Sequence, residues 1–286
     1  MISPALTDHI ATTTERITII KPVSGGSINQ AYYLATLSGE YFIKFNSANR
    51  FPLMFQREQE GLSAIASTNM IAVPQVIAAG ELEDDAFLLM EWIPAGISNK
   101  KSQTTFGEQL AQMHRHSSSS FGFDADNYMG SLPQSNKRHT NWSDFFRDER
   151  LTPMLNIANR KGYLTFNDNH NVEQIYKKLG EIFPEEPPAL IHGDLWSGNY
   201  IISKSGKPYL IDPAVSYGHR EFDIAMTTLS GGFDRAFYEA YHATYPLQPG
   251  WQERLELYNL YPLLLHLNLF GAGYLGQVRQ AIATYI

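Results

Sequence analysis

The residue pattern of this chain changes once, close to Pro94, and that change restricts the folds open to it. Up to residue 93, short β-type runs alternate with turns, whereas beyond the polar segment 98–105 most of the chain has the spacing of amphipathic helices. We therefore expect an α+β protein with a sheet-containing part at 1–93 and a larger, mainly helical part at 94–286. A length of 286 residues fits this division, since a folding unit averages about 150 residues.

The first part is predicted to form a mostly antiparallel sheet interrupted by one helix. Its β-type runs occupy residues 17–23, 30–37, 41–45, 75–79 and 87–93. Between the third and fourth runs, residues 51–68 place Phe55, Leu62 and Ile65 at helical spacing, and Glu58 falls on the same face. This helix is expected to pack on the sheet.

The second part is predicted to be helical except for a strand-rich island. Helical patterns cover residues 106–116, 142–161, 172–183, 235–245 and 253–270. The island contains β-type runs at 189–192, 200–203 and 209–211, with a Ser205-Gly206-Lys207 turn between the last two. A short hairpin embedded among helices suggests a functional reason for its presence.

Three polar residues of this island have the spacing of a phosphoryl-transfer site. Asp194 and Asn199 lie on one loop, and Asp212 follows at the end of the hairpin. Phosphoryl transfer uses a carboxylate to orient the attacking hydroxyl and oxygen ligands to hold Mg²⁺ on the nucleotide phosphates, and protein kinases space such residues similarly. The alternative is that these residues only stabilise turns.

Lys44 and Glu58 are predicted to form an ion pair in the first part. Lys44 lies among apolar neighbours in a strand, where a charge needs a partner. Glu58 points to the apolar side of the next helix, whereas Glu60 is rotated from it by about 200°. Such a pair places the ammonium on nucleotide phosphates. The alternative is an edge-strand lysine that reaches solvent.

Two backbone segments complete a candidate nucleotide site. The loop between the first two strands contains Gly25, Gly26 and Ser27, whose N–H groups could approach phosphates, although a Gly-Gly pair is also typical of a simple hairpin turn. The end of the sheet, formed by Met90, Glu91, Trp92 and Ile93, could present its backbone to an adenine edge.

Composition excludes several classes of protein. Acidic residues (29) outnumber basic ones (22), which argues against nucleic acid as the main partner. The absence of cysteine excludes disulfides, thiolate metal sites and cysteine nucleophiles. The first fifteen residues lack the features of a secretory signal, and the most apolar stretch, 255–275, is interrupted by Pro262 and polar residues. We expect a cytoplasmic protein that does not insert into membranes.

Beyond these features, the sequence resembles the fructosamine kinase (ketosamine 3-kinase) family. The likeness extends from about Gly25 to Gly276 and includes HGDLWSGN at 192–199, IDPA at 211–214, GGF at 231–233 and HLNLFG at 266–271. The HGD motif with its later Asn and Asp is shared with aminoglycoside phosphotransferases and choline kinases. The Leu-Trp-Ser insert and the last two segments are what indicate ketosamine kinases.

The resemblance implies a bilobal protein-kinase-like fold and ATP-dependent phosphorylation of the 3-hydroxyl of a ketosamine, free or protein-bound, leading to deglycation. It implies the following roles: Asp194 as catalytic base, Asn199 and Asp212 as Mg²⁺ ligands, Lys44 with Glu58 as phosphate clamp, Met90 to Ile93 as adenine hinge, and His192 and Asp223 as structural supports of the catalytic loop. Because Ser27 stands where some relatives have cysteine, a thiol switch at that position is excluded.

The same resemblance leaves the acceptor less sharply defined. Trp196 is expected to pack on the sugar or amine of the substrate, or else to lie buried beneath the catalytic loop. His266 and Asn268 could reach the same cleft, although a core histidine is the commoner outcome. An aminoglycoside or other small-alcohol phosphotransferase, or a catalytically silent nucleotide-binding protein, are the alternative functions. The oligomeric state is not specified.

Overall fold

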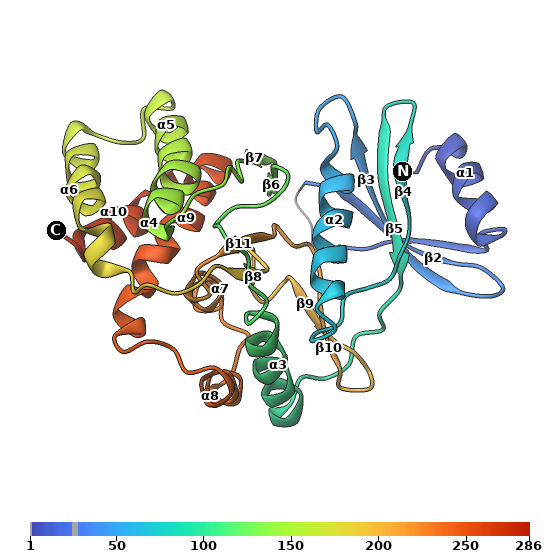
Figure 1. Ribbon diagram of the computed structural model, residues 1–286. Helices are drawn as coiled ribbons and strands as arrows, with labels where there is room; N and C mark the ends of the chain where they lie inside the picture. The colour runs from blue at the N-terminus through green and yellow to red at the C-terminus, as the bar shows by residue number, and fades with distance from the viewer. Residues whose placement is uncertain (1, 25–27) are drawn as a thin grey trace.

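The computed structural model describes residues 2–24 and 28–286, and these form two parts joined side by side. The N-terminal part contains a sheet with two flanking helices, and the C-terminal part is mostly helical (Figure 1). The two termini lie at opposite ends of the molecule. This is the two-part α+β arrangement expected from the single change of pattern in the sequence.

The N-terminal sheet contains all five predicted strands in the order β1-β2-β3-β5-β4, with each neighbouring pair antiparallel. The strands are β1 (Ile19–Pro22), β2 (Gln30–Ala35), β3 (Glu40–Ser47), β4 (Val76–Leu82) and β5 (Asp85–Glu91). In the centre of the sheet, Lys44 of β3 lies opposite Leu88 of β5. Lys44 is therefore on an interior strand, and the edge-strand alternative is wrong.

Helices α1 (Pro4–Thr14) and α2 (Met54–Ser67) cover opposite faces of this sheet. Alternate residues of β5 explain the two layers: Phe87 and Leu89 pack in the core under α1, whereas Leu88 and Met90 pack in the core under α2. The sequence predicted α2 but not α1. Helix α1 begins with proline directly after a capping serine, which is a recognisable start signal.

The C-terminal part is built mainly from helices that bury apolar faces on one another. These are α3 (Lys100–Met113), α4 (Trp142–Phe145), the π-helical turn η1 (Phe146–Leu151), α5 (Thr152–Arg160), α6 (Phe166–Ile182), α7 (Glu221–Met226), α8 (Arg235–Thr244), α9 (Trp251–Phe270), the 3₁₀ turn η2 (Ala272–Tyr274) and α10 (Leu275–Ala283). The polar segment 98–105, which was not predicted to be helical, contains the start of α3, because Asn99 and Ser102 cap that helix reciprocally.

Three short antiparallel pairs are inserted among these helices. The predicted hairpin is present as β9 (Tyr200–Ile202) with β10 (Pro208–Leu210). The run before it forms β8 (Ala189–Ile191), which pairs with β11 (Ser216–Gly218), and a further hairpin joins β6 (Asn127–Met129) to β7 (Leu132–Gln134). The elements from β8 to β11 occupy the middle of the molecule, next to the sheet-containing part (Figure 1).

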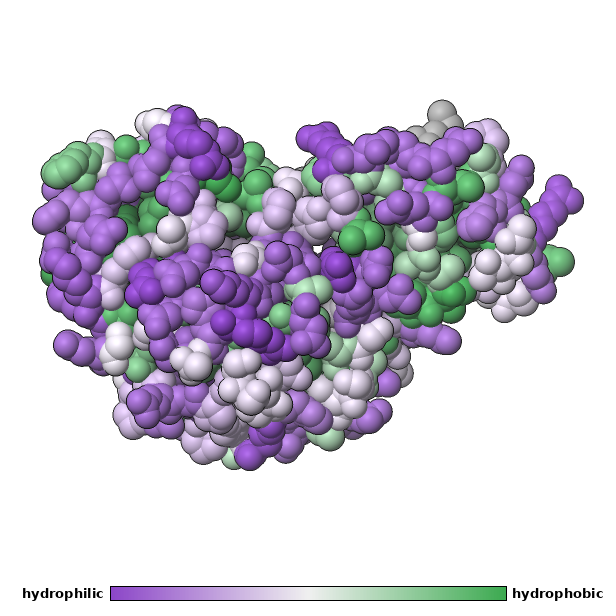
Figure 2. Space-filling view, turned by 45° about the horizontal axis from the view of Figure 1, so that its top comes forward, coloured by the Kyte–Doolittle hydropathy of each residue, from purple (hydrophilic) through white to green (hydrophobic). Residues whose placement is uncertain are grey.

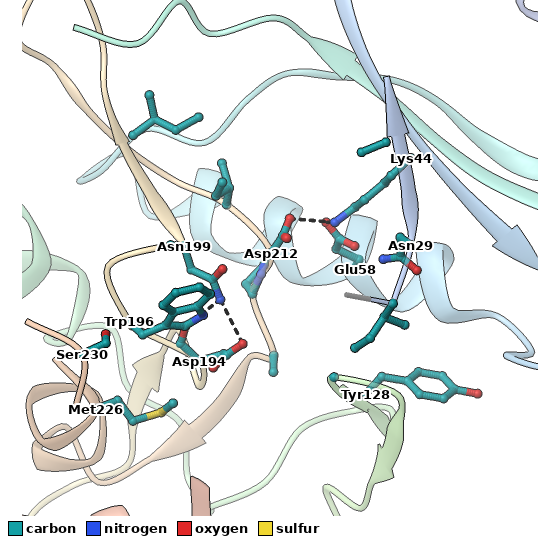
Figure 3. A pocket seen from close by; sticks show the side chains of 18 of the residues that line it. Asn29, Lys44, Glu58, Tyr128, Asp194, Trp196, Asn199, Asp212, Met226 and Ser230 are labelled. Atoms are coloured by element: carbon teal, nitrogen blue, oxygen red, sulfur yellow. Dashed lines mark hydrogen bonds and ion pairs between the residues drawn. The ribbon is translucent and has the colours of Figure 1, made fainter. Parts of the chain in front are cut away.

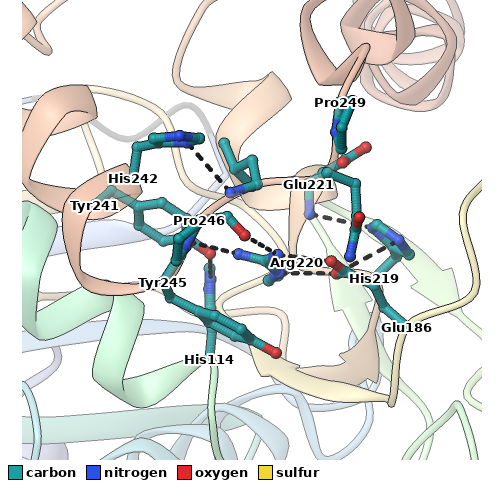
Figure 4. Close-up of polar contacts among 12 residues, drawn as sticks. His114, Glu186, His219, Arg220, Glu221, Tyr241, His242, Tyr245, Pro246 and Pro249 are labelled. Atoms are coloured by element: carbon teal, nitrogen blue, oxygen red, sulfur yellow. Dashed lines mark hydrogen bonds and ion pairs between the residues drawn. The ribbon is translucent and has the colours of Figure 1, made fainter.

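A buried arginine ties the segment before β8 to the helices behind it. The Arg220 guanidinium donates to both carboxylate oxygens of Glu186, at 2.6 and 2.8 Å, and also to the carbonyl oxygens of Tyr245 and Pro246 (Figure 4). Because the charge is paired and its donors are largely satisfied, its burial is tolerated. This arrangement holds the start of α7 firmly against α8.

Polar side chains cover most of the face drawn in Figure 2, where a notch separates the two parts of the molecule. Among residues 2–24 and 28–286, no helix combines the length and the apolar character that crossing a membrane requires.

Candidate active site

A cleft of about 1000 Å³ lies between the two parts, and side chains of both line it. It brings together Lys44, Glu58, Asp194, Asn199 and Asp212, as Figure 3 shows. These residues come from β3, from α2 and from the loops on either side of the β9–β10 hairpin. The spatial convergence on which the sequence interpretation depends is therefore present.

The loop that carries Asp194 is held against the segment after Asp212 by a close backbone approach. Gly193 has a φ of +83°, and a Cβ atom at this position would lie 2.1 Å from the carbonyl oxygen of Ala214. The Ala214 N–H donates to the carbonyl oxygen of His192 at 2.9 Å. Only glycine satisfies both the left-handed backbone and the contact.

Asp223 of α7 also holds this loop in place. Its buried carboxylate accepts from the backbone N–H groups of His192, at 2.7 Å, and Gly193, at 2.9 Å. It also accepts from Nε2 of His114 at 3.1 Å, and Nδ1 of His114 is 2.7 Å from the Tyr241 hydroxyl. One carboxylate thus fixes two successive peptide groups of the catalytic loop.

His192 links the loop to the strand that precedes Asp212. Its Nδ1 accepts from the N–H of Asp194 at 3.2 Å, and its Nε2 donates to the carbonyl oxygen of Ile211 at 2.9 Å. Burial lowers the pKa of His192, so a neutral ring with its proton on Nε2 satisfies both contacts. The geometry is that of a structural residue.

Asp194 and Asn199 contact each other directly. The Asn199 side-chain amide donates to a carboxylate oxygen of Asp194 at 2.9 Å and to its carbonyl oxygen at 2.8 Å. Both contacts use the amide nitrogen, which leaves the amide oxygen as an available ligand. Burial raises the pKa of Asp194 to about 7, although the hydrogen bond from Asn199 opposes this shift.

Lys44 is buried between two carboxylates. Its ammonium lies 2.5 Å from Glu58 and 2.7 Å from Asp212. Burial by itself would lower the pKa of Lys44, but the two carboxylates outweigh it and hold the pKa above its usual value, so the charge persists. Glu60 instead pairs with Arg57 at 2.8 Å on the outer side of α2, as its rotation on the helix predicts.

The oxygen ligands present are suited to Mg²⁺ bound together with phosphates. Asp212 has a half-exposed carboxylate, and Asn199 lines the cleft beside it. In the described residues, no three or more histidine, cysteine or acidic side chains converge as they would in a metal site built by protein alone. A carboxylate and an amide oxygen suit Mg²⁺, which keeps several ligand positions for water and substrate phosphates.

The predicted adenine hinge also lines the cleft. Met90, Glu91, Trp92 and Ile93 are at its edge, where the sheet ends and the chain enters the helical part. The three residues of the predicted phosphate loop, Gly25, Gly26 and Ser27, lie outside the described residues.

The predicted acceptor residues are placed differently from one another. The Trp196 side chain is 38% exposed and lines the cleft beside Asp194, so it is not buried beneath the loop. His266 is half-buried and also lines the cleft. Asn268 does not reach it: this residue is buried, and its amide donates to the carbonyl oxygen of Met154 at 2.9 Å. The expectation that Asn268 contacts substrate is corrected accordingly.

Sequence reasoning missed most of one wall of the cleft, which we call the distal wall. It consists of Asn127, Tyr128, Gly130, Met226, Leu229, Ser230, Leu263, Leu265, His266, Leu269, Phe270, Tyr274 and Gln277. These residues come from the β6–β7 hairpin, from α7 and the loop after it, and from α9 to α10. Apart from the HLNLFG segment, which contains Phe270, no local pattern marks them.

Comparisons with known proteins identify relatives of this chain. The sequence pattern of the fructosamine kinase family matches residues 2–286. A protein of Synechocystis named a probable ketoamine kinase is 43% identical over 268 residues, covering 93% of this chain and 90% of its own. The chloroplastic protein-ribulosamine 3-kinase of Arabidopsis thaliana is 39% identical over 277 residues, covering 95% and 83%.

Solved structures show the same fold. A candidate fructosamine-3-kinase from Thermobifida fusca superposes with a TM-score of 0.90 and 31% identity over 99% of both chains. An aminoglycoside phosphotransferase superposes with a TM-score of 0.66 at 15% identity, again over 99% of both chains, which shows a common fold only. The match over nearly the whole length establishes that this chain belongs to the fructosamine kinase family, a family of phosphotransferases.

Proposed function

We propose that this protein transfers the γ-phosphoryl group of ATP to the 3-hydroxyl of a ketosamine, a sugar joined to an amine by glycation, and so initiates deglycation. The observation that carries the proposal is the convergence of Asp194, Asn199, Asp212 and Lys44 in one cleft of a chain from this family. These groups are the set that phosphoryl transfer to an alcohol requires.

Asp194 is the proposed catalytic base. Its carboxylate lines the cleft beside Asn199 and Trp196, where it can orient an acceptor hydroxyl. The hydroxyl oxygen forms a bond to the γ-phosphorus, the bond from that phosphorus to the bridging oxygen of ADP breaks, and the hydroxyl proton passes to the carboxylate. Asn199 fixes the carboxylate through its amide hydrogen bond.

Lys44 and the two metal-ligand candidates serve the nucleotide in this proposal. The Lys44 ammonium has three donors, of which Glu58 and Asp212 occupy two, so one can reach a phosphate oxygen. Asn199 and Asp212 would hold Mg²⁺, which would neutralise negative charge on the phosphate groups. The residues at 90–93 would contact the adenine, and Trp196 would pack on the sugar or amine of the acceptor.

The test is an acceptor panel with the purified protein and Mg-ATP. Ribulosamine, fructosamine, an aminoglycoside and choline are compared by ADP release, and the phosphorylated carbon of each product is located by NMR. We expect the ketosamines to be phosphorylated at C3 and the products to release their amine. Turnover confined to the aminoglycoside, or no ADP formation with any acceptor, contradicts the proposal and favours one of the two alternative functions.

A variant pair tests the assignment of the base. Asp194→Asn should lower kcat by about 10²-fold or more while nucleotide binding, followed by calorimetry, persists. Asp144→Asn serves as control, because Asp144 is a partly exposed carboxylate paired with Arg147 outside the cleft. Near-normal turnover in the Asp194 variant would remove this residue from the proposed role.

A further inference from the structure

The distal wall differs in charge from the rest of the cleft. The acidic and basic side chains that line the described part of the cleft are Lys44, Arg57, Glu58, Glu91, Asp194 and Asp212, all on the sheet, on α2 or on the loops around β9–β10. The distal wall contains no aspartate, glutamate, lysine or arginine. A charged group placed there would lose water without gaining an ionic partner, which is costly.

Three aromatic rings form the outer end of the distal wall. The ring centroids of His266 and Phe270 are 5.7 Å apart, those of His266 and Tyr274 are 5.1 Å apart, and those of Phe270 and Tyr274 are 6.2 Å apart. Helix α9 ends at Phe270, and the turn through Gly271 brings Tyr274 back beside it. We call these three residues the aromatic cluster.

The aromatic cluster presents apolar surface that the residues described by the structure leave partly exposed. Phe270 is 54% exposed although it lines the cleft. Burial lowers the pKa of His266, so its ring is uncharged at neutral pH and offers no cation to a carboxylate. An exposed aromatic group in a concave, uncharged wall is typical of a binding surface for an apolar group.

The chemistry of a ketosamine determines which of its groups meets this surface. Its nitrogen is attached to C1, two carbons from the hydroxyl on C3. Once that hydroxyl is at Asp194, the amine and its substituent lie only a few bonds away, in the same cleft that Trp196 and the distal wall line. The nucleotide fills the opposite end, next to Lys44, so the distal wall is the space left for the substituent.

We propose that the aromatic cluster of His266, Phe270 and Tyr274 binds the substituent on the ketosamine nitrogen and selects uncharged aliphatic or aromatic substituents over those that carry a carboxylate. This inference rests on the proposed function, because it concerns the acceptor of that reaction. It adds a specificity determinant to a site whose polar residues explain only the phosphoryl transfer.

The test compares two synthetic ribulosamines of matched length. One carries a butyl group on nitrogen and the other a 3-carboxypropyl group, so that they differ in a terminal methyl or carboxylate. We expect kcat/KM of the unmodified protein to be about tenfold or more higher for the butyl compound, with the difference mainly in KM. Equal values, or a preference for the carboxylate, would overturn the inference while leaving the proposed function intact.

Two variants and a matched control locate the effect. Phe270→Ala should reduce the preference because the butyl compound binds more weakly. Phe270→Lys should shift the ratio of the two kcat/KM values by about tenfold or more toward the carboxylate compound. KM for ATP should stay unchanged in both variants. Phe166→Ala is the control, because Phe166 also stacks on a histidine one helical turn away, His170, but is 89% exposed on α6 outside the cleft.

The results distinguish a failure of this inference from a failure of the proposed function. An unaltered preference in Phe270→Lys overturns the inference, as does an equal shift in the Phe166 control. If neither ribulosamine is phosphorylated while another alcohol is, the proposed function fails and the inference fails with it.

Discussion

The substitution Asp223→Asn tests the support of the loop at 192–199 separately from the catalytic role that we propose for it. Asp223 is fully buried, and its two oxygens accept from the N–H groups of His192 and Gly193 and from the ring of His114. Asparagine has nearly the same shape but replaces one acceptor oxygen by a donor NH₂. In either orientation, at least one of these buried N–H groups then faces another donor.

The expected cost follows from the number of contacts. In the less disruptive orientation the NH₂ group replaces the oxygen that serves Gly193 alone, so one hydrogen bond is lost and two become bonds to a neutral acceptor. A buried donor without a partner costs about 1–3 kcal/mol, and weaker bonds to a neutral oxygen add to this. We expect the free energy of unfolding to fall by about 2–4 kcal/mol.

Urea unfolding followed by circular dichroism measures this loss, and steady-state kinetics gives its functional consequence. Because the loop carries Asp194, the relative fall in kcat should be larger than the relative change in KM for ATP. Asp144→Asn is again the control, and a surface pair of this kind should change stability by less than about 1 kcal/mol. If Asp223→Asn behaved like the control in both measurements, the carboxylate would not be what holds the loop.

Three further predictions follow from the described contacts. Gly193→Ala should lower the free energy of unfolding, measured in urea, by more than about 3 kcal/mol, because the new Cβ would lie 2.1 Å from a backbone oxygen in a left-handed conformation. A loss below about 1 kcal/mol would contradict this. Asn268→Ala should lower stability by about 1 kcal/mol and leave both KM values unchanged, whereas a raised acceptor KM would return this residue to the site. Hydrogen bonds from Arg279 lower the pKa of Asp168 to about 2, although burial opposes this shift. Above pH 4 the ionised carboxylate should therefore contribute up to about 2 kcal/mol to the free energy of unfolding. This contribution should be lost as the pH falls to 2. That pH dependence should flatten in Asp168→Asn, and an unchanged profile would refute the assignment.

The sheet and the polar residues of the site could be predicted because each leaves a local signal. Short runs of β-type residues separated by turns indicate strands, and all five strands of the sheet were predicted on that basis. Lys44 was noticed because a charge in an apolar strand needs a partner, and the structure places it in contact with Glu58 at 2.5 Å. The spacing of Asp194, Asn199 and Asp212 indicated a single cleft, which the structure contains.

Some elements could not be predicted because their pattern is set by distant contacts. Helix α7 is buried along its whole length, so its residues show no alternation between an apolar and a polar face. The distal wall joins Tyr128 of a hairpin to Phe270 at the end of α9 and Tyr274 beyond it, and only the tertiary fold makes these residues neighbours of one cleft. Judged by residue type alone, these tyrosine and phenylalanine residues would be expected in the hydrophobic core.

The misplacement of Asn268 was avoidable, and the reason bears on the aromatic cluster. Residues two apart on a helix are separated by about 200°, and Asn268 accordingly lies on a different side of α9 from His266, with its amide on the carbonyl oxygen of Met154. The same geometry excluded Glu60 as the partner of Lys44. Residues four apart do share a face, which puts Phe270 with His266. With His266 in the cleft, helical spacing therefore favours its apolar neighbour at 270 over the polar residue at 268, and Phe270 does line the cleft.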